Sequence, residues 1–502
     1  MKFPILAPSL LSLLLLLTGC GELDKPRAGA PAEPILLGPC DRPDDPALVR
    51  IVNEAQCAQI QVAENPRQPD GRQIELAVMV LPAIARVAKP DPIFYLAGGP
   101  GQSAISSGPA VFSALLELRR QREVILVDQR GTGRSNNLSC VVSETPEDFT
   151  LSSAAALALE VNKLRECLPT LDADPALYTT LIAAGDLDFV RRALGYEQIN
   201  LLGISYGTRA ALVYLRQFGA HVRSMILDGV APPSVNILAG ASADTDVALD
   251  RLFRDCQSSS ACAQAFPDLR AHFVGLTQQL TLNPVEVEIR HPKTGELILM
   301  SIDHVLVARL VRQVLYHRTL STLLPLALSQ AVEGDYQALL TLGYQFHDDS
   351  DSISAGMMAS VFCAEDMAQA TGMTEEGQYF SGSMNEFMLE VCQFWPRGEV
   401  AAEYFQAVSS DVPVLLLSGE LDPVTPPKFA EQAAQTLVNS RHLIVRGVGH
   451  NAGFTGCVPD LMVEFIEQLA PQELAAGCID SIRRPPFFTS TAGPQSVVGG
   501  DG

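Results

Sequence analysis

The chain has 502 residues, which is long enough for one large α/β domain together with a substantial insertion. Its formal net charge of -22 at pH 7 would repel a phosphate backbone or an anionic lipid surface, so nucleic acid is excluded as an expected partner. The histidines are scattered and no C-x-x-C pair occurs, so we expect no metal site and no cofactor.

The first residues resemble a bacterial lipoprotein signal. A lysine precedes an apolar run that is too short to span a bilayer, and the run ends at Leu17-Thr18-Gly19-Cys20. Residues 1–19 would be removed, and Cys20 would carry the acyl chains. A plain secretory signal with an incidental cysteine is the alternative. Gly21, where an aspartate would favour retention in the inner membrane, is typical of outer-membrane sorting.

Residues 20–39 are rich in Pro, Ala and Gly and are expected to form a flexible leash. Beyond the N-terminus, no stretch is long and apolar enough to form a membrane helix. We therefore predict a protein of the cell envelope, on its periplasmic side, that contacts the membrane only through its lipid anchor. The sequence does not indicate an oligomeric state.

Cysteine usage supports export. The sequence holds 11 cysteines, and without Cys20 an even number remains, which suits an oxidising compartment. The sequence cannot fix the connectivity. Nearest-neighbour pairing would give Cys40–Cys57, Cys140–Cys167, Cys256–Cys262, Cys363–Cys392 and Cys457–Cys478. Each such local loop would stabilise the fold by roughly 2–4 kcal/mol.

Residues 40–233 are predicted to form the first part of an α/β core, beginning with an extension at 40–65. Buried strands are expected at 74–84 and 92–96. The second strand ends in the glycine-rich loop Ala97–Ser103, which lets a backbone N–H approach a reacting carbonyl oxygen. We predict Gly99 as one oxyanion donor, with Gly98 as the neighbour that could hold this place instead. A tight turn without a ligand is the alternative.

Segment 199–212 carries the strongest signal for chemistry. An apolar run reaches Gly203-Ile204-Ser205-Tyr206-Gly207, and a helix-compatible run follows immediately. This strand, sharp turn and helix form the G-x-S-x-G elbow, which exposes a serine hydroxyl at the top of a sheet. We predict Ser205 as nucleophile and the Tyr206 N–H as the second oxyanion donor. A glycine-punctuated strand end with an ordinary serine is the alternative.

Around the elbow, further elements are expected at regular intervals. The pattern predicts a strand at 123–127, helices at 152–168 and 183–194, and a strand at 224–227. From 234 to 400 strand signals become rare and amphipathic helical stretches dominate, at 246–256, 304–316, 319–332 and 335–344. A short β pair, 285–289 and 297–302, interrupts them. We predict a mainly helical lid that encloses the substrate.

Residues 401–480 are predicted to form the second part of the core. The pattern indicates strands at 412–417 and 443–445 and helices at 428–438 and 460–469, and residues 481–502 are expected to be a disordered tail. The loops after the two strands carry Asp422 and His450. With Ser205 they follow the order serine, acid, histidine that α/β hydrolases use.

The chemistry of this order is a serine activated by a histidine. His450 would take the proton of Ser205, and Asp422 would hold the imidazole in the required tautomer. Asp228, after the strand that follows the elbow, competes with Asp422 for the role of acid. We prefer Asp422 because the next strand delivers the histidine.

Together these motifs resemble the proline iminopeptidase and tripeptidyl aminopeptidase group of α/β hydrolases, in its secreted branch and with a tripeptidyl-type C-terminal segment. The resemblance extends from residue 75 to residue 480. The matching segments are Gly98-Gly99-Pro100-Gly101, Asp128-Gln129-Arg130-Gly131, Asp186 to Arg191, the Ser205 elbow, Ser360 to Asp366, Cys392 with Trp395-Pro396, and the Asp422 and His450 loops. Ala97 and Ile204 depart from the pattern, so the resemblance leaves the substrate preference open.

The resemblance implies an α/β-hydrolase fold, with a mostly parallel sheet between helices, and the hydrolysis of a peptide bond near a free amino terminus. A proline, another amino acid or a short peptide would be released through an acyl-enzyme. Such enzymes need an anion for the substrate ammonium group, and Glu365, with Asp366 beside it, is the candidate. The alternative is that Glu365 merely lies next to a disulfide. The Gly99–Pro100 bond could be cis.

Two other functions stay open on the sequence. The same triad could hydrolyse carboxylic esters, because this fold hosts both chemistries. A non-catalytic binding protein is a weaker alternative, since all three triad residue types are present.

Overall fold

The computed structural model describes residues 35–43, 46–140, 151–292, 294–345, 353–369, 377, 379–380 and 383–494. Cys20, residues 1–34 and residues 495–502 lie outside this part of the chain. The signal and the lipid anchor therefore stay predictions. None of the helices in the described ranges combines the length and apolar character that crossing a bilayer requires.

A nine-stranded sheet forms the centre of the molecule, in the order β1-β2-β3-β5-β4-β6-β7-β10-β11. Within this sheet β5, β4, β6, β7, β10 and β11 run parallel to one another, while β1, β2 and β3 continue the sheet as antiparallel neighbours. Their bounds are Gly38–Pro39 (β1), Gln56–Ala63 (β2), Gln73–Leu81 (β3), Ile93–Leu96 (β4), Val124–Val127 (β5), Ile199–Ile204 (β6), Val222–Asp228 (β7), Val414–Gly419 (β10) and Ser440–Val445 (β11). The predicted α/β-hydrolase sheet is confirmed.

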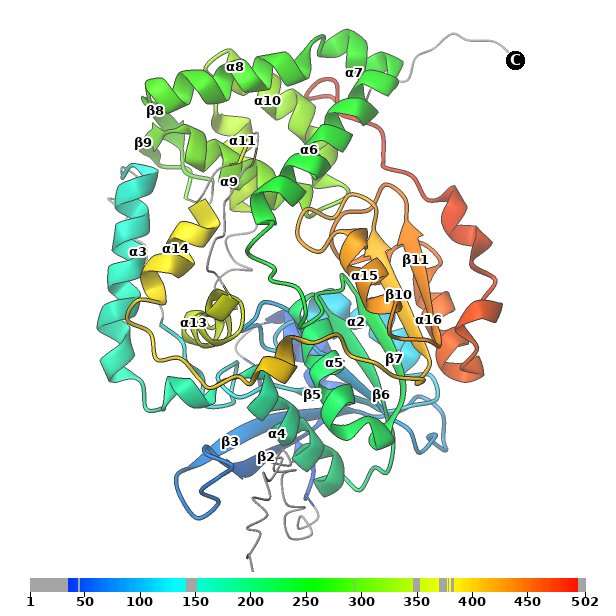
Figure 1. The fold of residues 1–502 in the computed structure, drawn as a ribbon. Coiled ribbons are helices and arrows are strands. Elements are labelled where there is room, and N and C mark those ends of the chain that lie inside the picture. Colours follow the sequence, from blue (N-terminus) through cyan, green and yellow to red (C-terminus); the bar gives the residue numbers. More distant parts are fainter. Residues whose placement is uncertain are drawn as a thin grey trace, which may run out of the picture.

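Helices cover both faces of this sheet (Figure 1). One face packs on α1 (Val49–Glu54), α2 (Gly108–Leu118) and α16 (Val458–Gln468). The other packs on α4 (Thr180–Ala193), α5 (Tyr206–Phe218) and α15 (Pro427–Ala434). Strands between two helical layers are buried on both sides, and this explains the continuous apolar runs in the sequence.

The segment between β7 and β10 forms a second helical layer above the carboxyl end of the sheet (Figure 1). It has its own apolar core, to which helices and a hairpin contribute. The whole segment comprises α6 (Ala241–Ser258), α7 (Ser260–Ala265), α8 (Leu269–Leu282), β8 (Val285–Arg290), β9 (Leu297–Ile302), α9 (His304–Leu315), α10 (Leu324–Val332), α11 (Gln337–Tyr344), α13 (Ala355–Ala364) and α14 (Ser383–Val391), of which α13 and α14 lie outside this apolar core. This is the inserted helical lid that the sequence predicted.

Helix α13 lies beneath this layer and was not predicted. Its sequence is apolar on all sides and most of its residues are buried, so it has no amphipathic period by which it could be recognised. It contacts α14, which in turn packs against α3 (Ser153–Cys167). The Cys363–Cys392 disulfide joins α13 to the residue after α14. The lid is therefore tied to the core through α13.

The structure forms the five disulfides that nearest-neighbour pairing gives, and so decides the connectivity that the sequence left open. Their Cα–Cα distances range from 4.9 Å for Cys40–Cys57 to 6.5 Å for Cys457–Cys478. These values lie within the range that a disulfide permits.

Both ends of the described chain are more ordered than the sequence predicted. Residues 35–39 were assigned to the leash, but the Ile35 N–H donates to Ala193 O at 3.3 Å and Gly38 pairs with Cys57 in the sheet. The extension at 40–65 includes β2, a member of the central sheet. At the other end Phe487 is 6% exposed within the lid core. Apolar side chains pack these segments against the sheet domain and the lid, although their composition predicted disorder.

Candidate active site

Ser205 lies at the apex of the turn between β6 and α5. Its backbone has φ 55° and ψ -125°, a conformation that L residues rarely adopt. A Cβ atom on Gly207 would lie 2.1 Å from Leu96 O, and one on Gly203 would lie 2.5 Å from Gly207 O. Both positions therefore require glycine, because strand and helix approach too closely for any side chain. The predicted nucleophile elbow has this geometry.

Asp422 and His450 lie together in the loops that follow β10 and β11. The distance from His450 Nδ1 to Asp422 Oδ2 is 2.8 Å. Burial disfavours the charged form of Asp422, but the neighbouring His450 and several hydrogen bonds outweigh it, so the pKa of this carboxyl lies below its usual range. Burial likewise opposes protonation of His450, but Asp422 outweighs it and raises the imidazole pKa.

Thr425 completes this pair and was not singled out from the sequence. Its hydroxyl donates to Asp422 Oδ2 at 2.8 Å and lies 3.2 Å from His450 Nδ1. The backbone N–H groups of Val424 and Thr425 also donate to the Asp422 carboxylate. The threonine, three residues after the acid in a tight turn, was the signal available in the sequence.

The corner at the carboxyl end of β7, formed by Asp228 and Gly229, connects the serine with the histidine. The Ser205 N–H donates to Asp228 O at 2.8 Å. A Cβ atom on Gly229 would lie 3.0 Å from His450 Cε1. No hydrogen bond joins the Ser205 hydroxyl to His450 among the described residues, and in unliganded enzymes such contacts often tighten only with substrate. Both groups thus lie against one corner, with roles that stay predictions.

Asp228, the competing acid, has other partners. Its carboxylate accepts hydrogen bonds from the Ala452 and Gly453 N–H groups, both at 2.8 Å. It is 1% exposed, and this burial raises its pKa to about 6. His450 Nδ1–H donates to Asp422 and not to Asp228, so the geometry favours Asp422 as the acid. Asp228 instead holds the backbone that follows the histidine.

The glycine loop after β4 lies against the elbow. A Cβ atom on Gly98 would lie 3.1 Å from the Ser205 Cβ, and the Gly99–Pro100 bond is cis. Among the described residues, neither the Gly99 nor the Tyr206 N–H has an intramolecular acceptor. Two free N–H groups next to a serine are what an oxyanion hole requires. The assignment of Gly99 and Tyr206 as donors stays a prediction that this arrangement favours.

Asp128, the residue directly after the neighbouring strand β5, holds this loop in place through hydrogen bonds. Its carboxylate accepts from the Ser103 hydroxyl at 2.6 Å and from the Ile105 N–H at 3.0 Å. On the other side it accepts from the Arg134 N–H at 3.0 Å. Asp128 is therefore a structural residue that supports the glycine loop.

The lid contacts the histidine loop directly through Tyr316, the residue after α9. The Tyr316 carbonyl accepts from the His450 N–H at 3.0 Å, and the two rings meet edge to face at 5.4 Å between centroids. Sequence reasoning did not find this contact, because Tyr316 is distant from His450 along the chain.

Glu365 and Asp366, predicted to bind a substrate ammonium group, lie beneath the elbow helix instead of facing open space. They are 2% and 1% exposed. Glu365 accepts from the Thr180 N–H at 2.8 Å, and Asp366 accepts from Arg209 Nη1 at 2.6 Å. This placement does not support the ammonium role and favours the alternative, that Glu365 is structural.

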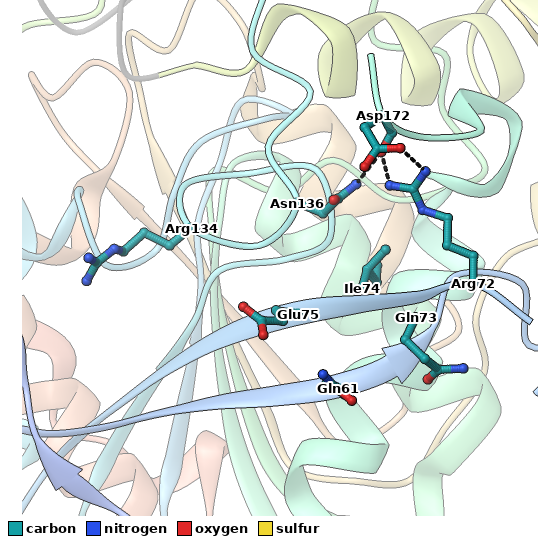
Figure 2. A pocket seen from close by; sticks show the side chains of 8 residues that line it. All are labelled: Gln61, Arg72, Gln73, Ile74, Glu75, Arg134, Asn136 and Asp172. Atoms are coloured by element: carbon teal, nitrogen blue, oxygen red, sulfur yellow. Dashed lines mark hydrogen bonds and ion pairs between the residues drawn. The ribbon is translucent and has the colours of Figure 1, made fainter.

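A polar pocket of about 630 Å³ lies away from these residues, on the outer side of β2 and β3 (Figure 2). It is lined by Gln61, Arg72, Gln73, Ile74, Glu75, Arg134, Asn136 and Asp172. Arg72 and Asn136 both point toward Asp172, and Arg72 pairs with its carboxylate at 2.5 Å (Figure 2). Arg72 and Asp172 thus neutralise each other, and none of the predicted site residues lines this pocket.

Comparisons with known proteins match both parts of the core. The family described as "alpha/beta hydrolase fold" matches residues 91–276, and the family described as "TAP-like protein" matches residues 377–477. Serine protease Hip1 of Mycobacterium tuberculosis is 25% identical over 501 residues, which cover 91% of this chain and 94% of that protein. Tripeptidyl aminopeptidase of Streptomyces coelicolor is 26% identical over 447 residues, covering 80% and 78%. Carboxylesterase B of Mycobacterium tuberculosis is 26% identical over 288 residues, covering 51% and 54%.

Proposed function

This chain is an α/β hydrolase related to serine peptidases, and from that premise we propose that it is an exported serine aminopeptidase. It cleaves a peptide bond near a free amino terminus and releases a proline, another amino acid or a short peptide. The observation that carries the proposal is the strained Ser205 at φ 55°, on the same corner of the sheet as the Asp422–His450 pair. The tripeptidyl aminopeptidase among the relatives supports cleavage from the amino end.

Acylation begins when Ser205 Oγ attacks the substrate carbonyl carbon. His450 Nε2 takes the hydroxyl proton as the new C–O bond forms, and the Asp422 carboxylate stabilises the resulting imidazolium. The N–H groups of Tyr206 and Gly99 donate to the oxyanion, and one such donor contributes about 3–4 kcal/mol to transition-state stabilisation. The C–N bond then breaks, and His450 returns the proton to the leaving amine.

Deacylation repeats these steps with water. His450 takes a proton from the water molecule as its oxygen bonds to the acyl carbon, and the bond to Ser205 Oγ breaks as the proton returns to the serine. The released acid carries the original amino terminus. The lid above the carboxyl end of the sheet limits how much of the substrate enters the site.

A fluorophosphonate probe and a substrate series test the proposal together. The wild type should be labelled, Ser205→Ala should not, and only the wild type should cleave aminoacyl or tripeptidyl p-nitroanilides. A peptide library with free and acetylated amino termini, read by mass spectrometry, should show cleavage of the free peptides alone. Equal cleavage of acetylated peptides would contradict an aminopeptidase.

A carboxylic-ester hydrolase is the second candidate, favoured by the resemblance to carboxylesterase B over about half of this chain. It would use the same three side chains and the same acyl-enzyme. Turnover of p-nitrophenyl esters without cleavage of any anilide or peptide would favour this function over the first.

Export through a lipid anchor on Cys20 is part of the proposal. The five disulfides, which use the remaining ten cysteines, support an oxidising compartment. Cys20→Ala should move the protein from the membrane fraction to the soluble periplasmic fraction and abolish incorporation of an alkyne-labelled fatty acid. Membrane association that survives this substitution would contradict the anchor.

A further inference from the structure

We propose that helix α13 of the lid fixes the separation of the two oxyanion donors, and that Glu365 at its C-terminal end is a positioning residue acting through Thr180 and Tyr206. This inference rests on the proposed function, because it assumes an oxyanion hole built from Gly99 and Tyr206. It gives Glu365 a role that differs from binding a substrate ammonium group.

The N-terminal end of α13 is joined to the glycine loop. The Ser354 N–H, at the N-cap, donates to Gly101 O at 2.9 Å, and Ile353 pairs with Gln102 in an antiparallel bridge. A Cβ atom on Gly101 would lie 2.6 Å from Ser354 O, so the two backbones touch. A shift of this end of the helix would therefore move the loop that carries Gly99.

The C-terminal end of α13 is joined to the elbow through a chain of hydrogen bonds. The Thr180 hydroxyl donates to Glu365 Oε2 at 2.9 Å and lies 2.7 Å from the Tyr206 hydroxyl. Since the single Thr180 proton points to the carboxylate, the Tyr206 phenol is the donor of the second bond. The residue whose N–H faces the oxyanion is thus held by its side chain to α13.

The middle of the helix also contacts this tyrosine. Tyr206 forms a small buried cluster with Met357 and Val361 of α13, together with Leu138 and Tyr178. A helix of this length is about 15 Å long, and its hydrogen bonds make it a stiff spacer. One rigid element therefore touches both segments that supply the predicted donors, which lie far apart in the sequence.

The charges around Glu365 make it a fixed acceptor. Arg209 lies 2.6 Å from Asp366 and 3.7 Å from Glu365, so one guanidinium serves two buried carboxylates. Tyr404 and Thr180 complete the hydrogen bonds of Glu365. With both oxygens engaged, the carboxylate has internal partners in the places where a substrate ammonium group would bind.

Oxyanion donors act only when they lie at hydrogen-bond distance from the developing charge. A misplacement of 1 Å at a catalytic group costs on the order of 10²-fold in rate, so a partial release of Tyr206 should lower kcat by about tenfold. Affinity for the ground state should change little, because the donors bind the transition state preferentially.

The test compares two buried phenols on the same helix. Tyr206→Phe removes the hydrogen bond to Thr180 at the start of α5. Tyr214→Phe removes a hydrogen bond of 3.1 Å to Asp188, which is made further along the same helix. Each should reduce thermal stability modestly. Tyr206→Phe, Thr180→Val and Glu365→Gln should each lower kcat for p-nitrophenyl acetate with little change in KM. The control variant Tyr214→Phe should not lower kcat. The affinity of the first three variants for 2-phenylethane boronic acid, which forms a tetrahedral adduct on serine, should fall by the same factor.

Because p-nitrophenyl acetate has no ammonium group, it separates the two roles of Glu365. A Glu365→Gln variant that is impaired only on substrates with a free amino terminus, through KM, would overturn the positioning role. Equal effects of Tyr206→Phe and Tyr214→Phe on kcat would overturn it too. Failure of the fluorophosphonate probe to label wild-type Ser205 would instead refute the proposed function, whatever the variants do.

Discussion

At the residue scale, two buried carboxylates near His450 differ in what they hold. Asp422 bonds the imidazole at Nδ1, and Asp228 bonds the backbone N–H groups of Ala452 and Gly453. Both lie at the ends of adjacent strands, so the sequence could order them only by chain position. Their hydrogen bonds distinguish an acid that faces the histidine ring from one that supports the loop behind it.

Substitution of the two acids should therefore have unequal effects. Asp422→Asn is expected to lower kcat by about 10⁴-fold at neutral pH, because an amide favours the wrong histidine tautomer. Asp228→Asn keeps one acceptor for the loop and should lower kcat by about tenfold at most, with reduced stability. Steady-state kinetics on one substrate, with thermal melts, measure both. A larger loss for Asp228→Asn would reverse the assignment.

The pH dependence of kcat/KM should report His450. Burial disfavours the imidazolium, but Asp422 and Asp228 outweigh burial and raise the pKa, so the acidic limb should lie above the ordinary histidine value of about 6.5. Activity needs the neutral ring and is lost as pH falls through this pKa. In Asp228→Asn one attractive charge is gone, so the limb should move to lower pH. A limb that stays in place would show that Asp228 does not act on the ring.

At the scale of elements, the elbow depends on contact between β6, α5 and β4. Strand and helix meet so closely that their backbones fill the space a side chain would need. The strain at Ser205 persists because these neighbours over-determine the turn.

Gly207→Ala should therefore destabilise the protein by about 1–3 kcal/mol or more and abolish labelling of Ser205. The matched control is Gly185→Ala in α4, where a Cβ atom meets nothing within 4 Å. That variant should be as stable as wild type or more stable, by about 1 kcal/mol, because alanine favours a helix. Chemical denaturation and the fluorophosphonate probe measure both properties. Retained labelling in Gly207→Ala would contradict the geometry of the elbow.

At the scale of the molecule, the lid and the sheet domain are coupled by α13 and by the contact between Tyr316 and His450. The C-terminal segment adds a further link, since Arg484 bonds Asp255 of α6 at 3.0 Å and the Phe488 N–H donates to Thr322 O at 3.2 Å. The C-terminal segment, which follows the last strand and helix of the core, thus returns to the lid and contacts it.

Loss of the Cys363–Cys392 bond should lower kcat even at a temperature where the variant is still folded. The double variant Cys363→Ser/Cys392→Ser opens a loop of 29 residues and should lose about 3 kcal/mol or more. The control, Cys457→Ser/Cys478→Ser, opens a loop of 21 residues beside α16 and away from α13. Compared at a temperature where both are folded, only the first should have a lower kcat. Equal kcat values would argue against coupling through α13.

Much of the core could be predicted from the sequence because its signals are local. Parallel strands buried on both faces give unbroken apolar runs, and the elbow needs glycines at fixed positions around Ser205. The amphipathic lid helices are likewise properties of short segments, whereas the pairing of the cysteines was left open by the sequence. Helix α13, apolar on all sides, offered no such period.

The sequence by itself determined the fold class and the place of the lid, and it predicted a catalytic order of serine, acid and histidine. Tertiary structure alone decided which acid bonds His450, where Glu365 and Asp366 are buried, and how the ends of the described chain pack. These depend on which segments, distant along the chain, meet at one edge of the sheet. A carboxylate has the same sequence signature whether it faces a substrate, a histidine or a buried arginine, and only its neighbours in space distinguish these roles.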